Sequence, residues 1–146
     1  MEKVNNFKEI NVGFLINQRV KEMNMEETRI CNFLKCTVKE VREMYDSTSL
    51  DSEILLKWSK LLEYDFFRIY TQHLILYSPP GSNKEYKIKN KEISLLPTFR
   101  KNLYTKQVID FILDLIKNGD KTASEIIKDY GIPKTTLYKW ISKYSK

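Results

Sequence analysis

Residues 121–144, KTASEIIKDYGIPKTTLYKWISKY, contain two short helical patterns separated by a glycine. Thr122 and Glu125 have the spacing of a capping box, in which a hydroxyl and a carboxylate each satisfy a free backbone N–H group. A helix is therefore predicted to begin at this pair. Its apolar residues form one stripe that ends at Tyr130, and Gly131 follows where a helix commonly closes in the left-handed conformation.

A second helix is predicted directly after this glycine. Pro133 suits the first turn of a helix, because its φ angle is fixed near the helical value and its missing N–H is not needed there. The predicted buried side consists of Leu137, Trp140, Ile141 and Tyr144. The predicted outward side consists of Lys134, Thr135, Tyr138, Lys139 and Ser142. Two short helices joined by a tight glycine turn are typical of a helix-turn-helix unit.

The outward side of the second helix is cationic and rich in hydrogen-bond donors. No Asp or Glu occurs from Lys134 to Lys146. Lysines can contact phosphates or guanine acceptors in the major groove, and hydroxyl groups can bond to either partner. The pattern therefore favours a helix that reads double-stranded DNA. The alternative is an ordinary helical hairpin, whose solvated face would also be rich in lysine.

The run GIPKTTLYKWISKY, residues 131–144, resembles the second helix of the helix-turn-helix in transposase-type proteins of the insertion-sequence orfA and resolvase kind. The shared pattern is a glycine, an apolar residue, a small cap and a Thr-Leu-Tyr-Lys-Trp-like core. In such modules the second helix enters the major groove. The resemblance implies DNA contacts from Lys134, Thr135, Thr136, Tyr138 and Lys139. Lys143, Lys146 and the lysines of the preceding linker are expected to grip the phosphate backbone.

The overall charge of the chain agrees with an anionic partner. Lysine and arginine outnumber aspartate and glutamate by 25 to 19, and the whole surplus follows residue 80. We expect a cytoplasmic protein, because no apolar run is long enough to cross a membrane and no secretory signal is recognisable. Two cysteines and one histidine cannot complete a tetrahedral zinc site, and we predict no metal or other cofactor.

The apolar spacing of the C-terminal helix pair recurs near the start of the chain. Ile126, Tyr130, Ile132, Leu137 and Trp140 have the same mutual spacing as Ile30, Leu34, Cys36, Val41 and Met44. In this alignment Cys31 and Cys36 take packing positions, so we predict that both are reduced and structural. Lys35 stands at the turn, where glycine is expected.

The second helix of this N-terminal pair, expected over residues 37–45, carries charges of both signs. Thr37, Lys39 and Arg42 are candidates for DNA contact. Glu40 and Glu43 lie on the same helix, and carboxylates next to phosphates repel them. Two alternatives stay open for this unit: weak DNA binding, or a role confined to the core and an interface.

Three more helical patterns flank this pair, over residues 12–23, 51–62 and 66–76, and Ser49 or Asp51 can cap the middle one. Five such helices, over about residues 10–78, resemble the lambda-repressor/Cro-like (XRE-type) helix-turn-helix domain of bacterial DNA-binding proteins. Domains of that type commonly pair through their last helix. The resemblance thus implies a homodimer interface at Phe66, Phe67, Tyr70 and Leu74. Aromatic residues at helical spacing are also typical of a core, which is the alternative.

The run SPPGSN, residues 78–83, marks a domain boundary, because two consecutive prolines do not continue a helix. We predict an all-α protein of two small helical domains. An XRE-like domain of five helices occupies 1–78, a basic linker with Pro, Gly and Lys occupies 79–104, and a three-helix transposase-type helix-turn-helix domain occupies 105–146. The last helical region is expected to start at Leu103, and its long first helix is expected to stop at Asn118 and Gly119.

Signals for catalysis are missing from the sequence. It contains no phosphate loop, no nucleophile elbow and no cluster of histidine and cysteine, and its four glycines are scattered. We therefore predict a protein that is not an enzyme and that binds specific sequences of double-stranded DNA, as a bacterial transcription regulator or as the DNA-recognition component of a transposition system. The alternative is a helical dimerisation or protein-interaction module with little DNA binding. A small helical enzyme or nuclease accessory is a third, weaker hypothesis.

Overall fold

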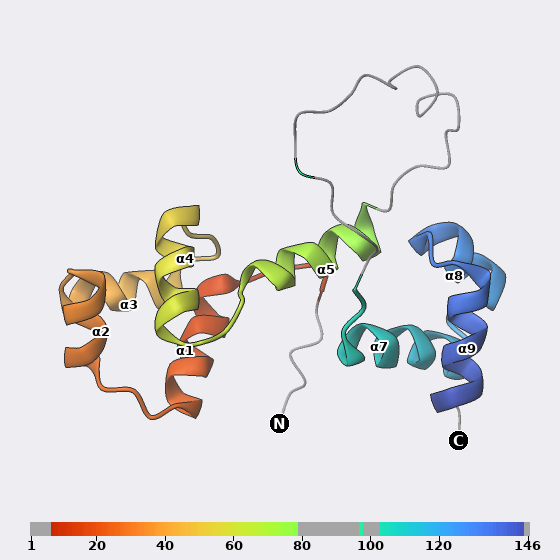
Figure 1. Ribbon diagram of the computed structural model, residues 1–146, viewed down its shortest axis with the longest axis horizontal. Helices are drawn as coiled ribbons and strands as arrows, with labels where there is room; N and C mark the ends of the chain where they lie inside the picture. Colours follow the sequence, from red (N-terminus) through yellow and green to blue (C-terminus); the bar gives the residue numbers. More distant parts are fainter. Residues whose placement is uncertain (1–6, 79–96, 98–102, 145–146) are drawn as a thin grey trace, which may run out of the picture. The chain divides into compact units, whose positions relative to one another are not determined.

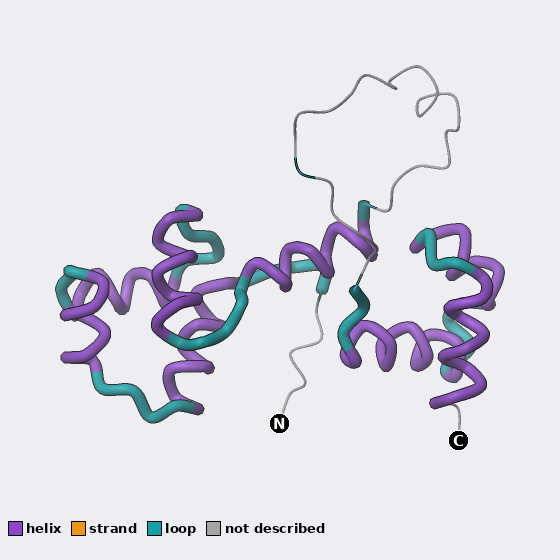
Figure 2. Tube along the Cα trace, in the orientation of Figure 1, coloured by secondary structure: helices purple, strands orange, loops and turns teal. Residues whose placement is uncertain are grey.

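The structure is a computed structural model that describes residues 7–78, 97 and 103–144. Every regular element in these ranges is an α-helix, and they contain no strand (Figure 2). The predicted all-α fold class is confirmed. The described residues divide into two compact units, one that ends at Thr71 and one that begins at Gln72.

The N-terminal unit contains four helices and the first part of a fifth. They are α1 (Val12–Glu22), α2 (Glu27–Leu34), α3 (Val38–Asp46), α4 (Ser52–Leu61) and, up to Thr71, α5 (Phe67–Tyr77) (Figure 1). Polar side chains begin several of them: Asn11 caps α1, Thr37 caps α3 and Asp51 caps α4. Asp51 rather than Ser49 therefore fills the capping position that the sequence left open.

One apolar core holds this unit together. Its buried members come from all four complete helices and from the connection before α5: Val12, Ile16, Val20, Ile30, Val41, Leu55, Trp58, Leu61, Leu62 and Phe66. Trp58 is fully buried, and its indole N–H points at the sulfur of Met44, 3.3 Å away. Fully burying one large apolar side chain stabilises a fold by about 1.5–3 kcal/mol. The core supplies the rigidity that positions α2 and α3.

Gly13 allows α1 to approach the end of α3 closely. The backbone N–H groups of Val12 and Gly13 donate hydrogen bonds to the carbonyls of Thr48 and Ser47, at 3.2 and 3.1 Å. A Cβ atom at position 13 would overlap the carbonyl oxygens of Met44, Tyr45 and Ser47. Position 13 therefore accepts only a residue without a side chain.

The C-terminal unit contains the second part of α5 with α7 (Lys106–Lys117), α8 (Ala123–Tyr130) and α9 (Lys134–Tyr144). Helix α9 packs against both α7 and α8. The buried apolar residues are Ile75, Leu76, Val108, Ile112, Ile126, Tyr130, Ile132, Leu137 and Trp140. Tyr104 adds an edge-to-face contact with Trp140, with ring centroids 4.9 Å apart.

Local chemistry fixes the ends of these helices. The Thr122 hydroxyl accepts from the N–H of Glu125, while the Glu125 carboxylate accepts from the N–H of Thr122 at 2.7 Å, which confirms the predicted capping box. Gly131 adopts the left-handed conformation, with φ 62°, as predicted. The Thr105 hydroxyl accepts from the N–H of Val108, so α7 begins at Lys106, and it ends at Lys117, just before Asn118, where the helix was expected to stop.

The second part of α5 packs with the C-terminal helices, an arrangement that the helical pattern of the sequence does not predict. Gln72 is only 4% exposed, and its side-chain amide donates to the Leu103 carbonyl at 2.9 Å. The amide oxygen of the same side chain accepts from the N–H of Thr105 at 3.3 Å. The ring of Tyr77 lies edge-on to that of Tyr130. The two units therefore meet in sequence at residues 71 and 72, whereas the domain boundary was expected after residue 78.

Replacing Gln72 with leucine should weaken the C-terminal unit by about 1 kcal/mol, because the Leu103 carbonyl and the Thr105 N–H lose their partner in a partly buried place. Urea unfolding can be followed by the fluorescence of Trp140 in a Trp58→Phe background, since each unit contains one tryptophan. Gln107→Leu is the control, because Gln107 is exposed on α7. Equal unfolding midpoints for the two variants would show that the Gln72 contacts contribute nothing.

Candidate nucleic-acid interface

Helix α9 presents the polar face that the sequence predicted. Leu137 is fully buried and Trp140 is 8% exposed, so the helix is anchored along one side. Tyr144, which was predicted on that side, is instead 39% exposed. The carbonyl of Pro133 accepts from the N–H of Leu137 at 3.0 Å and begins the helix. Six of the polar side chains that the sequence placed on the outward face or against DNA are exposed: Lys134, Thr135, Tyr138, Lys139, Ser142 and Lys143. Thr136 is half-buried.

The cations of this face are not neutralised by nearby acids. Within the described ranges, no carboxylate oxygen lies within 4.0 Å of the ammonium groups of Lys134, Lys139 or Lys143. The Lys134 ammonium lies 5.9 Å from the ring centre of Tyr138, which is itself 50% exposed. Such a contact at an exposed site contributes only about 0.5–1 kcal/mol. The face is therefore open to an external anion.

The neighbouring helix α8 is electrically different. Lys121 at its start is bonded to Asp129, with 2.6 Å between the ammonium nitrogen and the carboxylate oxygen. This hydrogen bond raises the pKa of Lys121. The Glu125 carboxylate is held by the backbone and hydroxyl of Thr122, which lower its pKa. Lys121, Asp129 and Glu125 thus have partners within the unit, whereas no ion pair is formed by Lys134, Lys139 or Lys143 of α9 in the described ranges.

The N-terminal unit repeats the same backbone plan in α2 and α3. Helices α2 and α8 both have eight residues, and each is followed by a left-handed residue, Lys35 with φ 59° and Gly131 with φ 62°. Ile30 and Val41 are fully buried, as are Ile126 and Leu137 at the matching positions of α8 and α9. A left-handed non-glycine residue costs about 1 kcal/mol, which Lys35 bears in this turn.

The three residues of the N-terminal unit that were candidates for DNA contact are all engaged with acidic side chains. Arg42 on α3 lies 3.6 Å from the Glu27 carboxylate of α2, and Lys39 lies 3.8 Å from that of Glu43. The Thr37 hydroxyl donates to the Glu40 carboxylate at 2.9 Å within a capping box. Helix α3 therefore has no free cationic face of the kind found on α9.

Of the four residues assigned to a dimer interface, the structure buries one in a core. Phe66 is only 1% exposed and belongs to the core of the N-terminal unit, so it is not available for a contact with a second chain. Phe67 and Tyr70 are half-buried against that core. Leu74 is 57% exposed but falls in the C-terminal unit. The core alternative holds for Phe66, and the prediction of an interface residue at this position is wrong.

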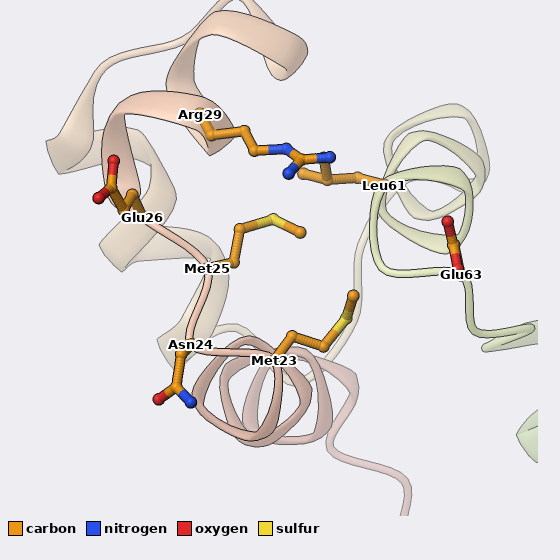
Figure 3. Close-up of a pocket in the computed structure, with 7 residues that line it drawn as sticks. All are labelled: Met23, Asn24, Met25, Glu26, Arg29, Leu61 and Glu63. Carbon is orange, nitrogen blue, oxygen red and sulfur yellow. The ribbon is translucent and has the colours of Figure 1, made fainter.

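A pocket of 270 Å³ lies in the N-terminal unit, at the connection between α1 and α2 and beside the end of α4. No motif in the sequence predicted this pocket. Figure 3 shows Met23, Met25 and Arg29 extending toward the segment that carries Leu61 and Glu63. No residue predicted to bind DNA lines it; the lining residues are Met23, Asn24, Met25, Glu26, Arg29, Leu61 and Glu63. The described part of the chain also contains no group of three or more His, Cys, Asp and Glu side chains able to hold a metal ion.

Comparisons of the chain with protein-family models, with curated proteins and with solved structures found no match. Among the described helices, none has the length and apolar character needed to cross a membrane.

Proposed function

We propose that the chain binds double-stranded DNA in a sequence-specific manner and that α9 is the helix that enters the major groove. The observation that carries the proposal is the exposed face of α9, on which Lys134, Lys139 and Lys143 have no acidic partner among the described residues. Amines, hydroxyl groups and a phenol on one helix face match the acceptors of base edges and phosphates. The biological setting is that of a bacterial transcription regulator or of the recognition component of a transposition system.

The C-terminal unit supplies what a reading helix needs. Leu137 and Trp140 fix the position of α9, and the turn at Gly131 fixes its direction relative to α8. A rigid support limits the entropy lost when side chains engage a base edge. Lys134, Thr135, Thr136, Tyr138 and Lys139 would then contact the groove, and Lys143 would contact the phosphate backbone.

A second function, protein interaction, is favoured for the N-terminal unit by one observation. The cations of α3 are paired with Glu27 and Glu43, so this surface offers DNA little net positive charge. We propose that the N-terminal unit serves a protein contact, a homodimer being the simplest case, while the C-terminal unit binds DNA.

Selection of bound sites from random duplexes, followed by a salt titration on the selected site, tests the proposal. We expect one enriched sequence and a linear fall of log affinity with log salt concentration, with a slope of about −0.9 for each phosphate that is neutralised. A palindromic site would indicate a symmetric dimer. No enrichment, together with a mass that rises with protein concentration, would favour the interaction module instead.

A further inference from the structure

Cys31 and Cys36 lie on either side of the turn between α2 and α3. The N–H of Cys36 donates to the carbonyl of Cys31 at 3.2 Å across the left-handed residue Lys35. Because this bond joins the two backbones directly, the two Cα atoms are at most about 7 Å apart. Side chains at these two positions of a helix end commonly touch each other. The local backbone therefore brings two thiols together.

The surroundings of the pair leave it within reach of solvent. Both cysteines are half-buried, lie against the core of the N-terminal unit and are free thiols. Burial raises the pKa of Cys36, and the nearby charges of Cys31 and Glu40 raise it further. The matching positions of the C-terminal unit are occupied by Ile127 and Ile132. Two isoleucines fill these positions in the C-terminal unit, so packing alone does not require cysteine at positions 31 and 36. The two cysteines add thiol groups, which can be oxidised.

We propose that Cys31 and Cys36 form a thiol–disulfide exchange site that closes into an intramolecular disulfide across the turn between α2 and α3. The separation of the two backbones is compatible with the Cα distance of a disulfide, which is usually 4.4–6.8 Å. The site would take low-molecular-weight disulfides, such as oxidised glutathione, as its oxidant.

The exchange proceeds in two steps. The thiolate of one cysteine attacks the S–S bond of oxidised glutathione, releases one glutathione thiolate and forms a mixed disulfide. The second cysteine loses its proton and attacks the protein-side sulfur of that mixed disulfide, which releases the second glutathione. Two protein thiols are oxidised, and one glutathione disulfide is reduced to two thiols. Because Cys36 has a raised pKa, the rate should increase with pH above neutrality.

Tryptic mapping of the full chain provides a direct test. Trypsin cleaves after Arg29, Lys35 and Lys39, so Ile30–Lys35 (ICNFLK) and Cys36–Lys39 (CTVK) are separate peptides in the reduced protein. After incubation in a glutathione redox buffer and alkylation of free thiols, we expect the two peptides to stay joined and to separate on reduction. Intact mass should show a monomer that has lost two hydrogens.

Two comparisons make the test decisive. Cys31→Ser and Cys36→Ser should each stop at the mixed glutathione disulfide. The folded chain should close the disulfide at a lower ratio of oxidised to reduced glutathione than the chain unfolded in urea, because the turn holds the thiols together. Closure only in urea, mixed disulfides on both wild-type cysteines, disulfide-linked dimers, or full alkylation would each overturn the proposal.

Discussion

Gly13→Ala should destabilise the N-terminal unit by about 3 kcal/mol, a large part of the stability of a small domain. Alanine has a better helix propensity than glycine by about 1 kcal/mol, so an isolated helix would gain from the change. The new Cβ, however, would overlap three backbone carbonyl oxygens, of Met44, Tyr45 and Ser47. Backbone atoms cannot rotate away as a flexible side chain can, so the steric cost outweighs the gain in propensity.

Urea unfolding followed by Trp58 fluorescence in a Trp140→Phe background isolates the N-terminal unit in this experiment. Lys21→Ala is the matched control, because Lys21 is exposed on the same helix, and its unfolding free energy should stay within about 0.5 kcal/mol of the wild type. A Gly13→Ala chain as stable as the control would mean that α1 and α3 do not approach as closely as described.

Lys134→Ala combined with Lys139→Ala should weaken binding to the selected duplex about a hundredfold, if each lost contact costs about 1–3 kcal/mol. Both side chains are exposed and lack acidic partners in the described ranges, and alanine favours the helix, so the fold should be unchanged. Fluorescence anisotropy at several salt concentrations measures the affinity, and the salt slope should become shallower. Circular dichroism checks that the helical content is retained.

The matched control for this pair lies on α3. Lys39→Ala combined with Arg42→Ala removes two cations that are engaged with Glu43 and Glu27, so we expect little change in affinity. If the α9 variant still binds DNA and the α3 variant does not, the helix that reads DNA is α3 of the N-terminal unit. Equal losses in both variants would indicate that the two units bind DNA together.

Features set by neighbouring residues were predictable from the sequence. The capping box at Thr122 and Glu125 and the left-handed turn at Gly131 depend on groups that are close in the chain, so composition and spacing determine them. Thr37 and Glu40 have the same capping-box spacing as Thr122 and Glu125. This spacing indicates that the Thr37 hydroxyl bonds to residues of its own helix. The outward position of Tyr138 and Lys139 followed from helical periodicity alone.

Features set by distant residues were not predictable in this way. Gln72 bonds to Leu103 and Thr105, and nothing in a helical pattern identifies partners so far along the chain. The pairing of Arg42 with Glu27 joins two helices and depends on their packing angle. Apolar periodicity showed that Phe66 would be covered, but it could not indicate whether its own unit or a second chain would cover it.

The repeated backbone plan of α2–α3 and α8–α9 has a consequence for how binding could be gained or lost. Fully buried Ile30 and Val41 correspond to fully buried Ile126 and Leu137, while the exposed side chains differ in charge. Surface positions can be exchanged without disturbing the interior, so affinity for a polyanion is a property that this scaffold can acquire or discard by a few substitutions. The scaffold itself would remain as it is.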